Sequence, residues 1–141
     1  MTIPTYVAGQ LFTKAHRLVR GRVYDALARY ELTPTSWAIL GITLQADGGT
    51  RLATVASQLS IKPPMVTMLA DDMITRGLIQ RIPHHTDGRA KLLVITAQGK
   101  KVAAEVEATL NTEIGNLLNG LSKEDIVTFQ RALETITRNA E

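Results

Sequence analysis

The sequence predicts a mainly α-helical fold with one small β-hairpin. Apolar residues recur every three or four positions over most of the 141 residues, which is the period of amphipathic helices. Between residues 78 and 96 the period changes, and two short β-type runs, GLIQRI and AKLLVIT, flank the turn sequence HHTDGR. A chain of this length fits one compact domain, residues 1–141.

A long first helix is expected over about residues 5–30, where apolar positions keep helical spacing: Val7, Leu11, Phe12, Ala15, Leu18, Val19, Val23, Ala26, Leu27 and Tyr30. The stretch LTPTSWAIL starts a second helix, with Thr33 as N-cap and Pro34 at the first helical position. Its expected inner face consists of Trp37, Leu40, Gly41 and Leu44. The sequence DGG at 47–49 should end it.

Two short helices are expected next. The first has an apolar face of Leu52, Val55, Ala56 and Leu59. SIK then turns the chain, and Pro63-Pro64 open the second helix, whose expected buried face is Val66, Leu69, Ala70 and Met73. Gly77 suits the left-handed position after its last turn. Asp87-Gly88 predicts the hairpin turn, because glycine tolerates a positive φ.

Two helices complete the chain. Thr96 can cap the first, which is lined by Val102, Val106, Leu110, Ile114 and Leu117. The second begins with Ser122 as N-cap, Asp125 in an Asp version of the capping box and Leu121 with Ile126 as a hydrophobic staple; its inner face is Ile126, Phe129, Leu133 and Ile136. One small lobe cannot cover all these long helices. An intertwined two-fold dimer through residues 5–30 and 97–138 is therefore favoured over an intramolecular bundle.

Positive charge is concentrated in the middle of the chain. Residues 51–101 hold eight Lys or Arg and three acidic residues, a net charge of +5, whereas the remainder has a net charge of −2. A basic region on an otherwise neutral protein suggests a polyanionic partner, although a solvated surface with a chance excess is the plain alternative.

The order helix, short helix, turn, helix and hairpin is that of a winged helix-turn-helix lobe, here about residues 33–96. In this arrangement the second helix of the motif lies in the DNA major groove and the hairpin reaches alongside it. Arg89 stands at the expected hairpin tip. Its permanent charge suits the negative potential of a narrow minor groove.

The stretch from Leu52 to Val102 resembles the core of the MarR family of winged helix-turn-helix transcription regulators. The resemblance is carried by the wing pattern Asp87-x-Arg89 with Leu93, Ile95, Thr96 and Gly99, by Val66-Thr67, and by Arg76-Gly77-Leu78-Ile79-x-Arg81. It implies a homodimer that binds a palindromic operator in double-stranded DNA and acts as a repressor, and it implies no cofactor.

The resemblance also implies roles for individual residues. Arg89 would enter the minor groove, and Asp87 would orient the wing with Gly88 by pairing with Arg81 or the side chain of Arg89. Thr67 would meet the DNA backbone or a base edge. Further DNA contacts are expected from Lys62, Pro64, Met65, Met68, Arg51, Arg76 and Lys91.

The second helix of the motif, which we call the recognition helix, is expected over residues 63–77, and it departs from the family pattern in three respects. Lys62 stands where a Ser usually caps the helix, and it cannot accept a hydrogen bond from a backbone N–H. Met68 stands where the family commonly has Arg and is expected to touch a thymine methyl group. Asp71 and Asp72 leave residues 63–77 with a net charge of −1. We expect these acids to point away from phosphate or to hold an Arg.

An effector cavity is expected between the dimer helices and the lobe, from Trp37, His16, Tyr24 and Arg17. In the family such crevices often receive aromatic acids or phenolic compounds, whereas the plain alternative is that Trp37 belongs to the core. The two acids and the two methionines expected to be exposed on the recognition helix also allow a different function. In this alternative the protein is a winged-helix module that binds another protein and not DNA.

Other classes have little support in the sequence. There is no cysteine, so a thiol nucleophile, a thiolate metal site and a thiol switch are excluded. No G-x-S-x-G or Gly-rich phosphate loop occurs, and adjacent His84 and His85 rarely bind one ion, so neither an enzyme nor a metal site is expected. The N-terminus lacks a signal-peptide pattern, and no apolar run is long enough to span a bilayer, so a cytoplasmic protein without a membrane partner is expected.

Overall fold

The computed structural model describes residues 4–141. Within them the chain forms six helices and one small antiparallel sheet. In order these are α1 (Thr5–Ala28), α2 (Pro34–Gln45), β1 (Thr50–Arg51), α3 (Leu52–Leu59), α4 (Pro63–Thr75), β2 (Ile79–Pro83), β3 (Lys91–Ile95), α5 (Ala97–Leu117) and α6 (Lys123–Ala140). The prediction of a mainly helical winged helix-turn-helix fold is confirmed.

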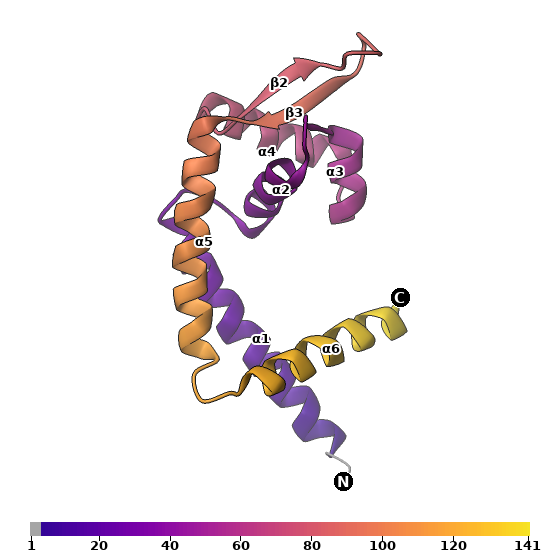
Figure 1. Cartoon of the computed structure of the whole chain (residues 1–141). Helices are drawn as coiled ribbons and strands as arrows, with labels where there is room; N and C mark the ends of the chain where they lie inside the picture. The colour runs from indigo at the N-terminus through magenta and orange to yellow at the C-terminus, as the bar shows by residue number, and fades with distance from the viewer. Residues whose placement is uncertain (1–3) are drawn as a thin grey trace.

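The molecule has a compact lobe at one end and long helices at the other (Figure 1). The lobe contains α2, α3, α4 and the sheet, from which the β2–β3 hairpin projects. α5 runs away from the sheet and packs along α1, and α6 then turns aside and crosses α1 in this view. α5 is therefore the element that joins the lobe to the helical end of the molecule.

The expected hairpin is present as β2 and β3, and a third strand, β1, which was not predicted, pairs with β3. Their order is β1-β3-β2, with Thr50 opposite Leu93 and Arg51 opposite Leu92. A two-residue strand is too short to show an alternating pattern, which explains why the sequence did not reveal it. Gly49, at φ +105°, lies directly against β3, where a Cβ would come within 2.8 Å of Val94 Cγ2.

The predicted helix starts are confirmed by their caps. Thr33 Oγ1 accepts the Ser36 N–H at 3.1 Å, and Thr96 Oγ1 accepts the Gly99 N–H at 2.9 Å. Ser122 and Asp125 form the reciprocal capping box of α6. Hydrogen bonds from Ser122 lower the pKa of the Asp125 carboxyl group; the bond from the hydroxyl has the larger effect and the bond from the backbone N–H the smaller. The ionised carboxylate therefore stabilises the fold at neutral pH, and this stabilisation is lost as pH falls through the lowered pKa.

The buried face of α2 differs from the expected one. Ser36, Ile39, Leu40 and Thr43 are buried, whereas Trp37 is half-buried and Leu44 is exposed. α2 is apolar on nearly every side, so its period did not identify which side faces the core.

The joint between the lobe and α5 is closely packed. The Thr96 hydroxyl donates to the Gly77 carbonyl at 2.6 Å, next to the left-handed Gly77 at φ +72°. Gly99 lies so close to the Leu78 carbonyl that a Cβ there would overlap it. The start of α5 is therefore fixed against the lobe.

Arg76, which the sequence suggested as a DNA contact, binds within the protein in this structure. Its guanidinium donates to the Tyr30 carbonyl at 2.6 Å and the Glu31 carbonyl at 2.8 Å, and it pairs with Asp72 at 3.4 Å. Glu31 has a positive φ of 54°, so the carbonyls that follow α1 point toward α4 in a turn that is unusual for a non-glycine residue. Arg76 thus fastens the end of α4 to the end of α1.

We predict that Arg76→Ala lowers the free energy of unfolding by about 1–3 kcal/mol, because two carbonyls lose a charged donor. Urea denaturation would measure the change. Arg131→Ala, an exposed substitution on α6, is the matched control and should stay within about 0.5 kcal/mol of the parent protein. Equal stability of the two variants would contradict the fastening role of Arg76.

The long helices leave much apolar surface uncovered in the single chain. Exposed side chains include Tyr6, Leu11, Phe12 and Leu18 on α1 and Val127, Phe129 and Ile136 on α6. α6 has no buried residue at all. The helices in the described part of the chain contain no candidate membrane-spanning segment.

Candidate nucleic-acid interface

The wing is the loop between β2 and β3, and its tip is not shaped as the sequence suggested. Gly88 does not have a positive φ. Backbone hydrogen bonds from His84 N–H to the Ala90 carbonyl at 2.9 Å and from Ala90 N–H to the Asp87 carbonyl at 3.0 Å close the loop. Side chains accept further backbone N–H groups: His84 Nδ1 accepts from Thr86 at 3.3 Å and from Asp87 at 3.2 Å, and Asp87 Oδ1 accepts from Arg89 at 3.2 Å. Local side-chain acceptors thus hold the turn.

Asp87 orients the wing, but not by the predicted ion pair. Its carboxylate binds the backbone of Arg89 and not a guanidinium. Arg81, which was expected as a partner, pairs instead with Asp71 at 2.7 Å. β2 lies against α4, so Arg81 lies beside this helix and not at the wing tip.

Ion pairs within the lobe compensate the charges of the two acidic residues of α4. Asp71 is held by Arg81 and Asp72 by Arg76. The expectation that these acids hold an Arg is confirmed, and their charge is compensated within the lobe. The negative charge of the helix is therefore no obstacle to an anionic partner.

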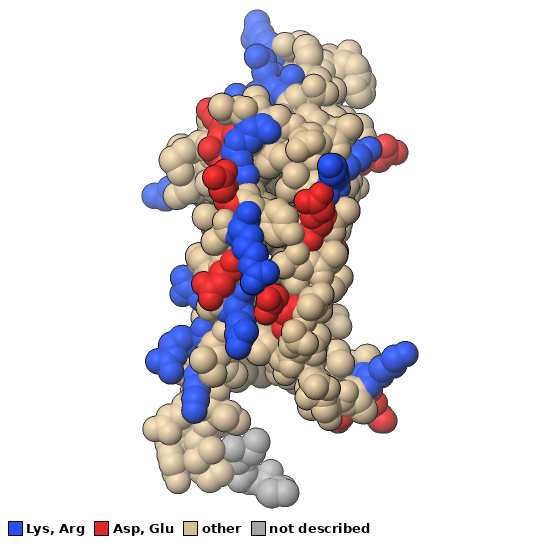
Figure 2. Space-filling model, turned by 90° about the vertical axis from the view of Figure 1, so that its left-hand side faces the viewer, with Lys and Arg blue, Asp and Glu red and all other residues tan. Residues whose placement is uncertain are grey.

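Four exposed cations belong to the wing, to the sheet beside it and to the start of α4. Arg89, Lys91, Arg51 and Lys62 are exposed, and within residues 4–141 no salt bridge joins any of them to an acid. In Figure 2, Lys and Arg side chains gather at the end of the molecule where Figure 1 has the hairpin, and farther down others lie both beside acids and apart from them. The wing and the elements beside it thus carry positive charge that no acid within residues 4–141 compensates by a salt bridge.

The outer face of α4 is apolar and accessible. Met65 and Met68 are 46% and 58% exposed, and a shallow depression is lined by Pro63, Pro64, Thr67, Met68 and Asp71. The Thr67 hydroxyl donates to the Pro63 carbonyl at 3.1 Å. Lys62 makes no side-chain cap, as expected; Pro63 and Pro64 carry no N–H, and the Met65 N–H donates to the Lys62 carbonyl at 3.0 Å.

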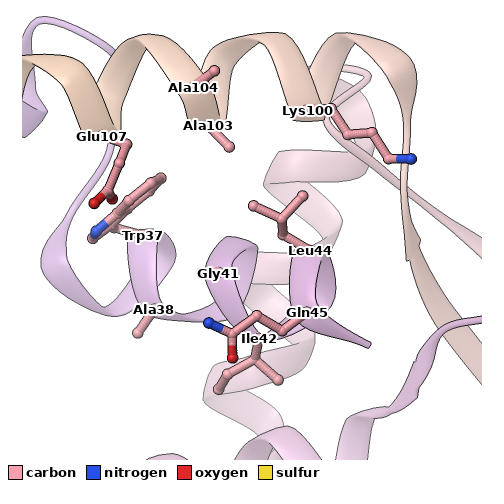
Figure 3. A pocket seen from close by; sticks show the side chains of 10 residues that line it. All are labelled: Trp37, Ala38, Gly41, Ile42, Leu44, Gln45, Lys100, Ala103, Ala104 and Glu107. Atoms are coloured by element: carbon pink, nitrogen blue, oxygen red, sulfur yellow. The ribbon is translucent and has the colours of Figure 1, made fainter. Parts of the chain in front are cut away.

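A cavity of about 690 Å³ lies between α2 and α5 (Figure 3). Trp37 forms one end, beside Glu107; α2 also contributes Gly41, Ile42 and Leu44, and α5 contributes Ala103, Ala104 and Lys100. Of the four predicted effector residues, only Trp37 lines it. His16, Arg17 and Tyr24 are exposed on α1, where Tyr24 contacts Arg20.

Sequence reasoning missed His84 and the third strand. His84 was read as one of two solvated histidines, but its ring organises the loop and stacks on His85 with centroids 4.9 Å apart. A signal was present, because a side-chain acceptor just before a Thr-Asp-Gly turn favours local hydrogen bonds.

Comparison with known proteins gives a consistent result. The model of the MarR family matches residues 32–91, which cover the helix-turn-helix and the start of β3. A MarR-family transcriptional regulator from Rhodococcus sp. RHA1 has 22% sequence identity and a TM-score of 0.81, with 96% of each chain covered.

Two DNA complexes show the same fold. The transcriptional repressor CouR, bound to a 23-mer DNA duplex, has 23% identity and a TM-score of 0.82, covering 92% of this chain and 91% of the other. CouR from Rhodococcus jostii RHA1 has also been solved with p-coumaroyl-CoA. A mutant of MarR from E. coli with operator DNA has 17% identity and a TM-score of 0.77, covering 91% of each chain.

The family match covers the lobe, and the common fold extends over the helices on both sides of it. The lobe therefore resembles the MarR family over residues 32–91, and the whole chain has the fold of MarR-family proteins of known structure.

Proposed function

We propose that this protein is a sequence-specific DNA-binding transcription regulator that acts as a homodimer on a palindromic operator. The observation that carries the proposal is the wing: Arg89 is exposed at its tip, and within residues 4–141 no acid pairs with it. An arginine in this position suits the minor groove, while the accessible face of α4 suits the major groove.

The dimer follows from the uncovered apolar surface of α1 and α6. A monomeric protein rarely exposes so many large apolar side chains on two helices. A second copy related by a two-fold axis would cover both helices and present two lobes to a symmetric site. The proposed dimerisation regions remain residues 5–30 and 97–138, with residues 33–96 as the DNA-binding lobe.

The cavity between α2 and α5 is the proposed effector site, and repression relieved by a small ligand is the proposed regulation. Ala103 and Lys100 of α5 line the cavity, and the start of α5 is fixed to the lobe through Thr96 and Gly99. A ligand that favours a different position of α5 would change the separation of the recognition helices, which must be about 34–36 Å for successive major grooves.

Effector binding has an optical readout, because Trp37 is the only tryptophan. A ligand that enters the cavity should change the fluorescence of Trp37, and Ala104→Phe, which adds a bulky side chain to the cavity lining, should weaken that ligand about tenfold or more. Ala108→Phe, also exposed on α5 but not lining the cavity, is the control. Equal ligand affinity in both variants would place the effector elsewhere. The screen would begin with aromatic acids and phenolic compounds.

DNA binding is tested by retention of random duplex DNA at increasing salt. We expect a steep loss of affinity, because each neutralised phosphate adds about 0.9 to the slope of log K against log salt. No retention at low salt, together with capture of a protein partner by the lobe, would favour the protein-interaction function instead.

A further inference from the structure

The ring of His84 lies at the base of the wing, and its hydrogen bonds fix its tautomer. Nδ1 accepts two backbone N–H groups, from Thr86 at 3.3 Å and Asp87 at 3.2 Å. A backbone N–H can only donate, so Nδ1 carries no proton while the loop has this shape. In the neutral ring the proton is therefore on Nε2.

That Nε2–H faces a second donor. Nη2 of Arg51 lies 3.5 Å from His84 Nε2, and a guanidinium has no acceptor. Two N–H donors cannot hydrogen-bond to each other, so both need an acceptor that lies between or beside them. The sheet brings them together, because Arg51 lies opposite Leu92 and Leu92 opposite Ile82. His84 is two positions beyond Ile82 and continues that face.

We propose that His84 Nε2 and the Arg51 guanidinium together hold one phosphate of the DNA backbone at the base of each wing. Phosphate oxygens accept several hydrogen bonds at once, and phosphate contacts fix the position of a protein on the duplex. His84 then has two functions: Nδ1 shapes the loop that carries Arg89, and Nε2–H binds DNA. The inference rests on the proposed function and adds to it a residue and a shared ligand.

His84→Asn separates the two functions. An asparagine oxygen also accepts N–H groups two and three residues ahead, so the turn is retained, but the distal donor is lost. We expect about tenfold weaker operator binding, because a hydrogen bond to a charged group is lost on each wing. His85→Asn is the matched control: the residue is exposed and stacked on His84, and its substitution should leave affinity unchanged.

A double-mutant cycle tests whether the two donors share one phosphate. If they do, His84→Asn combined with Arg51→Ala loses less affinity than the product of the two single losses. A neutral methylphosphonate at one backbone position of each half-site should weaken the parent protein and leave the double variant His84→Asn with Arg51→Ala almost unchanged. Additive losses, or no such position, would overturn the shared site.

The imidazole ¹⁵N spectrum distinguishes DNA from a free anion. Operator DNA should shift the His84 Nε2 resonance, whereas inorganic phosphate at the same phosphate concentration should not. An equal shift with inorganic phosphate would make the site a general anion site and overturn the proposal. Operator binding with unchanged affinity in His84→Asn would overturn this inference alone, while failure of the parent protein to bind any DNA would overturn the proposed function as well.

Discussion

Phe129→Glu should convert the protein to a monomer and reduce operator affinity on the order of a thousandfold. Phe129 is 53% exposed on α6 in the single chain, so a glutamate there costs the folded protomer little. In a dimer the same position would bury a charge without a partner, which is strongly unfavourable. A monomer binds only one half-site. In the dimer, binding of one lobe holds the second lobe at a high effective concentration near its half-site, and the monomer loses this advantage.

Sedimentation and gel-shift titration of the same preparation measure both consequences. Thr128→Glu is the control, because it adds the same charge at an exposed neighbouring position outside the apolar face of α6. The control should remain dimeric and bind DNA normally. A dimeric Phe129→Glu protein with full affinity would show that α6 does not form the interface.

Arg89→Ala should weaken binding to every operator about a hundredfold, from one lost charged contact on each of two wings. The slope of log K against log salt should fall by about two, since one phosphate-neutralising charge is lost per protomer. The relative preference among operators should change less than the overall affinity, unless the minor groove at the wing differs in width between them.

Arg131→Ala is the control for charge, because Arg131 is exposed on α6 and far along the chain from the lobe. It should leave both affinity and salt slope unchanged. Arg89→Ala with unaltered affinity and slope would mean that the wing does not contact DNA.

Local signals in the sequence predicted most of the fold. Thr33, Thr96 and Ser122 are caps that act within three residues, and the structure has all three. Gly77 has the positive φ that its place after α4 predicts. Such features depend on nearby atoms only, which is why a single sequence reveals them.

The differences arise where distant segments meet. Arg76 was read as a DNA contact, but its partners are carbonyls of Tyr30 and Glu31, more than 40 positions away. Arg81 pairs with Asp71 and not with Asp87, because β2 packs on α4. His16, Arg17 and Tyr24 do not join Trp37, because α5 and not α1 closes that cavity.

Selection of bound sequences from a random DNA pool tests the central claim most directly, because it examines DNA binding and two-fold symmetry together. We predict enrichment of two inverted half-sites with centres one helical turn apart, about 10–10.5 base pairs, or a multiple of it. Enrichment of a single asymmetric element by a monomeric protein, or no enrichment at all, would contradict the account.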